Sequence, residues 1–345
     1  MSLASDTLRR EFKKNDDIRD AGLTTPEDVR RFDDIRYGTD ADCQLLDVYR
    51  PKENETQDDA DSPAGNASGG KEDTGFAENL NDEPLPVIIS IHGGGWVYGD
   101  KELYQYYCMS LTQRGFAVVN FTYRLAPEYK FPSCQEDTNL VVSWVLSHAQ
   151  EYGFDTEHIF MVGDSAGAHA LGLYAGICTN PEYAALYPFT VPQVRPSHSE
   201  LSWANRPAVE RSEGAFPQIF RPTAIALNCG AYWMDEEVGM DSQTMELMND
   251  LFADGATKEN LEKICVPKTI TENYVPTYFM TCTGDFLQSQ AALLYSRLME
   301  CQVPCEFQFY GDKDHELGHV FHLNMRSEIA ATCNDAQCEF FRKFM

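Results

Sequence analysis

Short apolar runs alternate with longer segments of helical periodicity along most of the chain. Several of these runs are rich in β-branched residues and lack strict polar–apolar alternation, which is typical of strands buried on both faces. They cover residues 86–91, 117–121, 158–162, 223–227, 277–281 and 305–310, and two earlier strands are expected near 32–37 and 44–49. Helices are expected between them at 102–114, 134–152, after Ser165, at 241–263, 288–301 and 326–345.

Alternating strands and helices predict an α/β fold with a mostly parallel central sheet covered by helices on both faces. A chain of 345 residues is long enough to bury a large core, and α/β folds of this size often form one domain. We therefore expect residues 1–345 to form a single domain.

Three segments depart from this alternation. Residues 1–33 predict one or two polar helices, and Thr25-Pro26-Glu27-Asp28 has the form of a helix start with proline at its first position. Residues 181–221 are rich in proline, serine and aromatic residues without a clear period. We expect both segments to supply a small cap over the site. Residues 53–84 carry ten acidic residues and one lysine with few large apolar side chains, which predicts a disordered acidic insertion.

Composition and charge exclude several classes of protein. A formal charge of −27 argues against nucleic acid as a partner and disfavours stable association with anionic membranes. Since no apolar run is long enough to span a bilayer and the polar N-terminus lacks a secretory signal, we expect a cytoplasmic protein. Eleven scattered cysteines without C-x-x-C pairs predict reduced thiols and no structural metal site. Nothing in the pattern indicates a particular oligomeric state.

Two glycine-rich motifs point to acyl-transfer chemistry. Gly163-Asp164-Ser165-Ala166-Gly167 follows a predicted strand and precedes a predicted helix, which is the setting of a G-x-S-x-G nucleophile turn. His92-Gly93-Gly94-Gly95 follows another strand and can direct backbone N–H groups at a developing oxyanion. Ser165 is therefore the candidate nucleophile, and His92 is expected to brace the glycine loop.

A serine nucleophile needs a base, and the base needs a group that orients it. In the α/β-hydrolase arrangement the acid and then the histidine follow the serine along the chain. Asp285 comes directly after the 277–281 strand and is the candidate acid, whereas Asp164 is expected to be structural. The candidate bases are His315, His319 and His322, which follow the last strand; His319 is favoured because Gly318 permits a tight turn and Phe321 can anchor the segment.

These motifs resemble the hormone-sensitive-lipase-like branch of the α/β-hydrolases. A third marker of that family, Tyr-Arg-Leu-Ala-Pro-Glu followed by Phe-Pro, stands at 123–128 and 131–132. The resemblance implies a cofactor-free carboxylesterase whose triad is Ser165, Asp285 and His319. It also implies oxyanion donors at the N–H groups of Gly94, Gly95 and Ala166. The acid here lies in Gly-Asp-Phe-Leu rather than the usual Asp-Pro-Leu, and His319-Val320-Phe321 replaces His-Gly-Phe.

The function expected from these observations is hydrolysis of small esters with short- to medium-chain acyl groups. One alternative is an amidase such as an arylformamidase, which would use the same catalytic residues to cut an amide bond instead of an ester bond. A non-catalytic small-ligand receptor on the same fold is another, and it is disfavoured because candidates for all three triad members are present.

Overall fold

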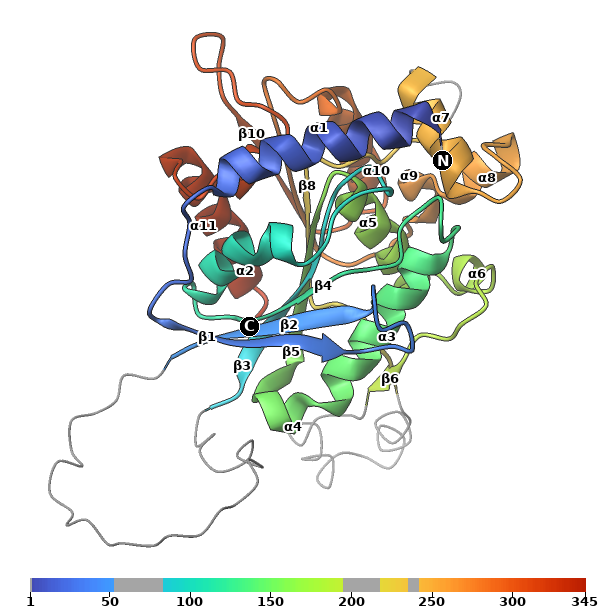
Figure 1. Cartoon of the computed structure of the whole chain (residues 1–345). Helices are drawn as coiled ribbons and strands as arrows, with labels where there is room; N and C mark the ends of the chain where they lie inside the picture. The colour runs from blue at the N-terminus through green and yellow to red at the C-terminus, as the bar shows by residue number, and fades with distance from the viewer. Residues whose placement is uncertain (1, 53–82, 195–217, 235–241) are drawn as a thin grey trace, which may run out of the picture.

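The computed structural model describes residues 2–52, 83–194, 218–234 and 242–345. Eight strands form one sheet in the order β1-β2-β4-β3-β5-β8-β9-β10 (Figure 1). Neighbours from β4 to β10 are parallel, whereas β2 is antiparallel to both β1 and β4. The strands are β1 Val29–Arg36, β2 Leu45–Pro51, β3 Leu85–Ile91, β4 Ala117–Phe121, β5 Phe154–Asp164, β8 Ile225–Asn228, β9 Thr277–Cys282 and β10 Cys305–Tyr310. This sheet confirms the predicted α/β fold.

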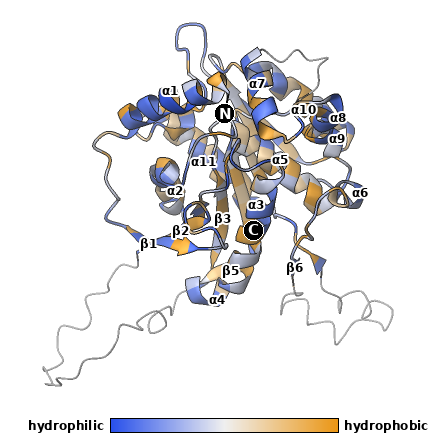
Figure 2. Ribbon diagram, turned by 45° about the vertical axis from the view of Figure 1, so that its right-hand side comes forward, coloured by the Kyte–Doolittle hydropathy of each residue, from blue (hydrophilic) through white to orange (hydrophobic). Residues whose placement is uncertain are grey.

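Two helical layers cover the sheet. On one face, α2 Gln105–Thr112 and α11 Glu328–Arg342 share a core in which Phe160 of β5 stacks on Phe341, with ring centroids 4.6 Å apart. The larger core on the other face includes side chains from α3 Ser133–Ser147, α5 Ala166–Thr179 and α10 Gln288–Glu300. Figure 2 shows hydrophobic residues gathered in the central strands, as burial between two layers requires.

The N-terminal helix, α1 Leu3–Asp20, crosses the edge of the sheet at which the parallel strands end, beside α7 Ser242–Leu251 (Figure 1). It is fixed there by polar and apolar contacts. Ser5 Oγ donates to Asp250 Oδ2 at 2.5 Å, and Leu8 is buried against the backbone of Gly95. The helix is thus held over the glycine loop, where a cap element was expected.

The predicted helix start at residues 25–28 is wrong. Val29 N donates to Pro26 O at 3.2 Å in a turn, and the chain then enters β1. The backbone groups that follow pair with β2, from Val29 opposite Pro51 to Arg36 opposite Leu45. Tertiary pairing therefore outweighs a local sequence that also suits a helix N-terminus.

The predicted continuous helix over 241–263 is also wrong, because the chain breaks it into two helices. α7 ends at Leu251, Gly255 adopts φ +80°, and α8 Lys258–Lys263 begins at a new cap where Thr257 Oγ1 accepts from Asn260 N at 3.3 Å. The remaining short elements are η1 Glu102–Tyr104, α4 Ala149–Tyr152, α6 Pro181–Ala184, β6 Gln193–Val194, β7 Gln218–Ile219, α9 Val266–Thr269 and η4 Phe321–Leu323.

Two predicted segments lie largely outside the described residues. They are the acidic insertion at 53–84, of which 53–82 are not described, and the centre of the 181–221 segment, 195–217. The described ends of the second segment pair with each other as β6 and β7. Among the helices of the described ranges, none combines the length and apolar character needed to cross a bilayer.

Candidate active site

Ser165 sits on the turn between β5 and α5 with φ +51° and ψ −119°. The turn is tight enough to demand both of its glycines. A Cβ on Gly163 would lie 2.6 Å from the carbonyl oxygen of Gly167, and one on Gly167 would lie 2.2 Å from that of Ile91. Such contacts are too close for any larger residue, so the G-x-S-x-G pattern is the sequence condition for this geometry.

The glycine loop follows β3 beside the serine turn. Gly94 has φ +112°, and a Cβ there would lie 2.0 Å from Tyr98 O. Within the described part of the chain, no acceptor receives the N–H groups of Gly94 and Gly95, whereas Gly93 N donates to Tyr104 Oη at 2.9 Å. Ala166 is the first residue of α5, where the N–H group has no intrahelical acceptor. The N–H groups of Gly94, Gly95 and Ala166 are thus left open to a ligand oxygen.

Asp285 and His319 come from the loops after β9 and β10. His319 Nδ1 lies 2.7 Å from Asp285 Oδ1, and the side chains are 15% and 1% exposed, respectively. His319 and Ser165 line the same pocket, together with Gly93 and Gly94. The structure therefore brings the candidate acid and base into contact beside the candidate nucleophile.

The Asp285 carboxylate has three hydrogen-bond donors. Thr281 Oγ1 donates to Oδ2 at 2.6 Å, and Leu287 N donates to Oδ1 at 2.9 Å, in addition to His319. Burial alone would raise the pKa of Asp285, but these hydrogen bonds and the nearby imidazole outweigh it and lower the pKa below its usual value. The group is therefore a carboxylate at neutral pH, the form that can orient an imidazole.

The loop that carries Asp285 and the loop that carries His319 are hydrogen-bonded to each other at the residues just before these two side chains. Gly284 and Gly318 form an isolated parallel β-bridge, and Gly284 N donates to Leu317 O at 2.8 Å. Leu317 N donates to Thr283 Oγ1 at 3.0 Å. This connection fixes where His319 leaves its loop relative to Asp285.

The other candidate histidines lie elsewhere. His315 is 82% exposed and its Nδ1 lies 3.1 Å from Asp312 Oδ1 at a loop tip. His322 is fully buried against Tyr107, neither of its ring nitrogens has a hydrogen-bond partner among the described residues, and burial lowers its pKa to about 3.

His92 braces the glycine loop, as expected. Its ring stacks on Tyr123 with centroids 4.0 Å apart, and its Nδ1 lies 2.7 Å from Gly93 O. Burial lowers the pKa of His92 to about 4, so the ring is neutral at physiological pH.

A second buried carboxyl group lies next to the nucleophile. Asp164 Oδ2 accepts from Tyr104 Oη at 2.7 Å, and the same Tyr104 oxygen accepts from Gly93 N. Burial raises the pKa of Asp164 to about 7. Tyr104 therefore connects the serine turn to the glycine loop, a role that no spacing in the sequence indicates.

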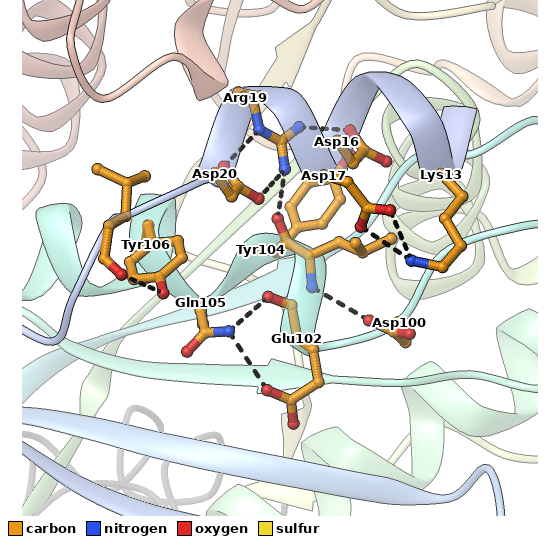
Figure 3. A network of polar contacts seen from close by, with 12 residues as sticks. Lys13, Asp16, Asp17, Arg19, Asp20, Asp100, Glu102, Tyr104, Gln105 and Tyr106 are labelled. Atoms are coloured by element: carbon orange, nitrogen blue, oxygen red, sulfur yellow. Dashed lines mark hydrogen bonds and ion pairs between the residues drawn. The ribbon is translucent and has the colours of Figure 1, made fainter. Parts of the chain in front are cut away.

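The helix α1 contributes a wall of the pocket through Phe12, Asp16 and Arg19. Figure 3 shows Arg19 held between Asp16 and Asp20 above Tyr104. Its guanidinium contacts Asp16 at 2.8 Å and Asp20 at 2.7 Å and donates to Leu103 O at 2.8 Å. The polar helices expected over residues 1–33 were predicted to supply part of a cap, but the sequence did not single out these three side chains.

Positive φ angles at non-glycine residues are concentrated around the site. Trp96 has φ +64°, Ser165 +51°, Cys229 +45° and Val320 +53°. They follow β3, β5, β8 and β10, so they share the edge of the sheet at which the parallel strands end. Residues other than glycine adopt this region at a cost, and such strain is typical of sites held in one geometry by their surroundings.

One group of side chains in the described ranges has the geometry of potential metal ligands. Cys229, Asp285 and His319 each offer an atom, and these atoms lie within 4.8 Å of one another. Cys229 was not among the sequence candidates. Its position directly after β8, at the edge where ligands bind in open α/β sheets, is the signal that could have identified it.

Comparison with known proteins agrees with this arrangement. Residues 76–189 match the family described as BD-FAE. The versiconal hemiacetal acetate esterase of Dothistroma septosporum is 28% identical over 67% of this chain and 66% of its own length. The ethyl acetate hydrolase of Pseudomonas putida is 30% identical over 36% of this chain and 39% of its own length. The aligned region thus spans less than two thirds of either relative.

Among solved structures, esterase B from Lactobacillus rhamnosis with a bound tributyrin phosphonate inhibitor matches 99% of this chain and 94% of its own, with a TM-score of 0.74 and 21% identity. An esterase from Pyrobaculum calidifontis matches with a TM-score of 0.65 and 19% identity, over 99% of this chain and 94% of its own. At these identities the likeness shows the fold. The chain therefore has the α/β-hydrolase fold, and its sequence is similar to parts of proteins named as esterases and acetate hydrolases.

Proposed function

We propose that this chain hydrolyses carboxylic esters through a covalent acyl-enzyme on Ser165, with His319 as base and Asp285 as the group that orients it. The observation that carries the proposal is the 2.7 Å contact between His319 Nδ1 and Asp285 Oδ1 beside a pocket lined by His319 and Ser165. Relatives named as esterases support the same reaction class.

The contact with Asp285 engages Nδ1 and leaves Nε2 of His319 for the serine proton. Ser165 Oγ attacks the ester carbonyl carbon while Nε2 takes the hydroxyl proton. The imidazolium then donates this proton to the departing alkoxide as the carbon–oxygen bond breaks. Asp285, ionised at neutral pH, stabilises the imidazolium without accepting a proton itself.

The negative charge that develops on the carbonyl oxygen needs donors already in place. The N–H groups of Gly94, Gly95 and Ala166 fit this role because no protein acceptor in the described ranges uses them. The N-terminus of α5 adds a favourable partial positive charge at the same point. Water then attacks the acyl-enzyme with His319 again as base, which releases the acid and restores Ser165.

The proposed substrates are small esters with short- to medium-chain acyl groups. The support is the pocket wall, in which Phe12 of α1 and Tyr98 lie 6.0 Å apart, edge to face, and limit the space beside Ser165. We also infer a reducing compartment, the cytoplasm being the one expected from the sequence. All eleven cysteines are free thiols, which agrees with such a compartment.

A panel of p-nitrophenyl esters from acetyl to palmitoyl, assayed beside N-formyl and anilide substrates, tests the substrate class. We expect kcat/KM to be highest at acetyl to octanoyl and much lower for amides. Faster hydrolysis of the N-formyl or anilide substrates would assign the chain to the amidases instead. A maximum at palmitoyl with activation at a lipid interface would contradict the proposed acyl length.

A further inference from the structure

A sulfur atom lies close to the Asp285–His319 pair. Cys229, directly after β8, places its Sγ in a group with a carboxylate oxygen of Asp285 and an imidazole nitrogen of His319, all within 4.8 Å of one another. Cys229 is 1% exposed, and its φ of +45° is one of the strained backbone conformations around the site. The proposed mechanism has no step for this thiol.

The surroundings of Cys229 are rich in sulfur. Its Sγ lies 3.8 Å from Met280 Sδ on β9. Cys282, at the end of the same strand, is buried with its thiol directed at the carbonyl oxygens of Leu317 and Gly318, 3.2 Å from each. Thiol and thioether groups favour soft or borderline metal ions over hard ones.

We propose that Cys229, Asp285 and His319 form an inhibitory binding site for a thiophilic divalent cation, with Zn²⁺ as the representative ion. Zinc takes thiolate sulfur at about 2.3 Å and imidazole nitrogen or carboxylate oxygen at about 2.0–2.2 Å. Ligand atoms around such an ion lie roughly 3–4 Å apart, so the three groups need only small rotations. A water molecule would complete the tetrahedron.

Charge and chemistry favour this occupant. The Asp285 carboxylate and a Cys229 thiolate together offset the charge of a divalent cation, and the thiol proton leaves to solvent when the metal binds. Mg²⁺ and Ca²⁺ prefer about six or more oxygen ligands. Of the three side chains only Asp285 offers oxygen atoms, so this group does not suit those ions. The exposed edge of His319 provides the route of entry.

Metal binding at this position would stop ester hydrolysis. This inhibitory effect, unlike the binding itself, rests on the proposed function. Metal on Nδ1 of His319 would leave the imidazole proton on Nε2, which could then not accept the serine proton, and metal on Nε2 would occupy the base itself. A carboxylate bound to metal would also no longer hold His319. The group is therefore an off-switch within the proposed triad, and it leaves the N–H groups of the glycine loop unaltered.

The first test is inhibition of p-nitrophenyl acetate hydrolysis after preincubation with Zn²⁺, Cd²⁺, Mg²⁺ or Ca²⁺. We expect Zn²⁺ and Cd²⁺ to inhibit at micromolar concentration, EDTA to restore activity, and Mg²⁺ and Ca²⁺ to have no effect. Cys229→Ala should keep basal kcat/KM within about threefold and require at least tenfold more Zn²⁺. Cys301→Ala, a thiol outside the group, is the matched control. Equal Zn²⁺ sensitivity of wild type and Cys229→Ala would overturn the site.

The second test does not depend on activity. Co²⁺ is added to the folded Ser165→Ala protein, and the thiolate-to-cobalt charge-transfer absorption in the near ultraviolet is recorded. We expect one equivalent to produce the band, and its loss in Ser165→Ala/Cys229→Ala and in Ser165→Ala/Cys229→Ser. A band that persists without the Cys229 sulfur would place the metal elsewhere. A Cys229-dependent band, together with a wild-type protein that hydrolyses no ester, would keep the metal site and overturn only the proposed function.

Discussion

Two carboxyl groups near Ser165 have opposite electrostatic surroundings. Burial acts to raise the pKa of both groups. In Asp285 this effect of burial is outweighed by the hydrogen bonds from His319, Thr281 and Leu287, so its pKa lies below the usual value. Asp164, next to Ser165, has the hydroxyl of Tyr104 as its side-chain donor, and its pKa rises to about 7. The environment thus keeps Asp285 an anion at neutral pH and leaves Asp164 partly protonated there.

The raised pKa of Asp164 predicts a pH-dependent stability difference. The folded state keeps this proton up to about pH 7, whereas the unfolded chain releases it near pH 4. The group therefore stabilises the fold at low pH. This contribution falls by about 1.4 kcal/mol per pH unit between those values, since the unfolded state binds fewer protons there.

Asp164→Asn removes the titration. We expect the free energy of unfolding of the wild type, minus that of Asp164→Asn, to be smaller at about pH 8 than at about pH 5. Urea unfolding of both proteins at the two pH values measures this difference in free energy of unfolding. The contributions of the other titrating groups largely cancel, because both proteins contain them. A difference that does not change with pH would contradict the buried titration.

The late histidines provide a matched set of substitutions. His319→Ala should lower kcat by at least about 10³-fold, because it removes the proposed base. His315→Ala should leave kcat within about twofold, since His315 lies 82% exposed at a loop tip. Circular dichroism checks that each variant folds. An active His319→Ala together with an inactive His315→Ala would mean that the wrong histidine has been assigned.

At the scale of elements, Tyr104 at the end of η1 connects the glycine loop with the serine turn, two motifs that are far apart in the sequence. Its hydroxyl accepts from Gly93 N in the glycine loop and donates to Asp164 in the serine turn. A single hydrogen-bonded oxygen thus couples the position of the proposed oxyanion donors to that of the nucleophile. Arg19 of α1, which donates to Leu103 O, supports the same segment from above.

Tyr104→Phe tests this coupling. Without the hydroxyl, Gly93 N and Asp164 each lose a buried partner, and the glycine loop can shift. We expect kcat to fall about tenfold with KM changed much less, because the loss concerns transition-state geometry. Tyr106→Phe is the control, since the Tyr106 hydroxyl donates to Leu23 O away from the loop. An equal fall in both variants would indicate a general loss of stability instead.

The central strands and the linking helices could be predicted because their burial requires continuous apolar runs between amphipathic segments. The turn at Thr25–Asp28 and the break within the predicted 241–263 helix could not be predicted, for different reasons. The first precedes a segment whose hydrogen bonds are satisfied by β2, a partner distant in sequence. In the second, the break at Gly255 depends on how α7 and α8 each pack, which helical periodicity alone does not reveal.

At the scale of the whole molecule, the strand ends that flank the acidic insertion and the site lie at opposite edges of the sheet. Residues 53–84 connect the end of β2 to the start of β3, where Leu85 pairs with Phe154 at the start of β5. Ser165 follows the other end of β5. The insertion therefore begins and ends far from the pocket, although 53–82 lie outside the described residues.

Replacing residues 57–79 with a short Gly-Ser linker should leave kcat/KM within about threefold, because a long surface loop adds little closure cost and its ends are remote from the chemistry. Steady-state kinetics with a p-nitrophenyl ester measures it, with the urea midpoint as a check on folding. A hundredfold loss would mean that the insertion reaches the pocket.

Much of the candidate site follows from chain order and strand ends, since Ser165, Asp285 and His319 were each placed by the element that precedes them. Three features were not identified in this way, although Cys229 also follows a strand end. Tyr104 acts through a hydroxyl whose partners come from distant turns. Phe12 reaches the pocket only because α1 folds back over the sheet, and Cys229 meets Asp285 and His319 through packing between neighbouring strands.

The central claim, an acyl-enzyme on Ser165 activated by His319, is tested most directly by mass spectrometry after exposure to a fluorophosphonate probe. The account predicts one adduct per wild-type chain, located on the peptide that contains Ser165, with labelling abolished in Ser165→Ala and slowed at least about 10³-fold in His319→Ala. Labelling of Ser165→Ala at the wild-type rate, or an adduct on another residue, would contradict it.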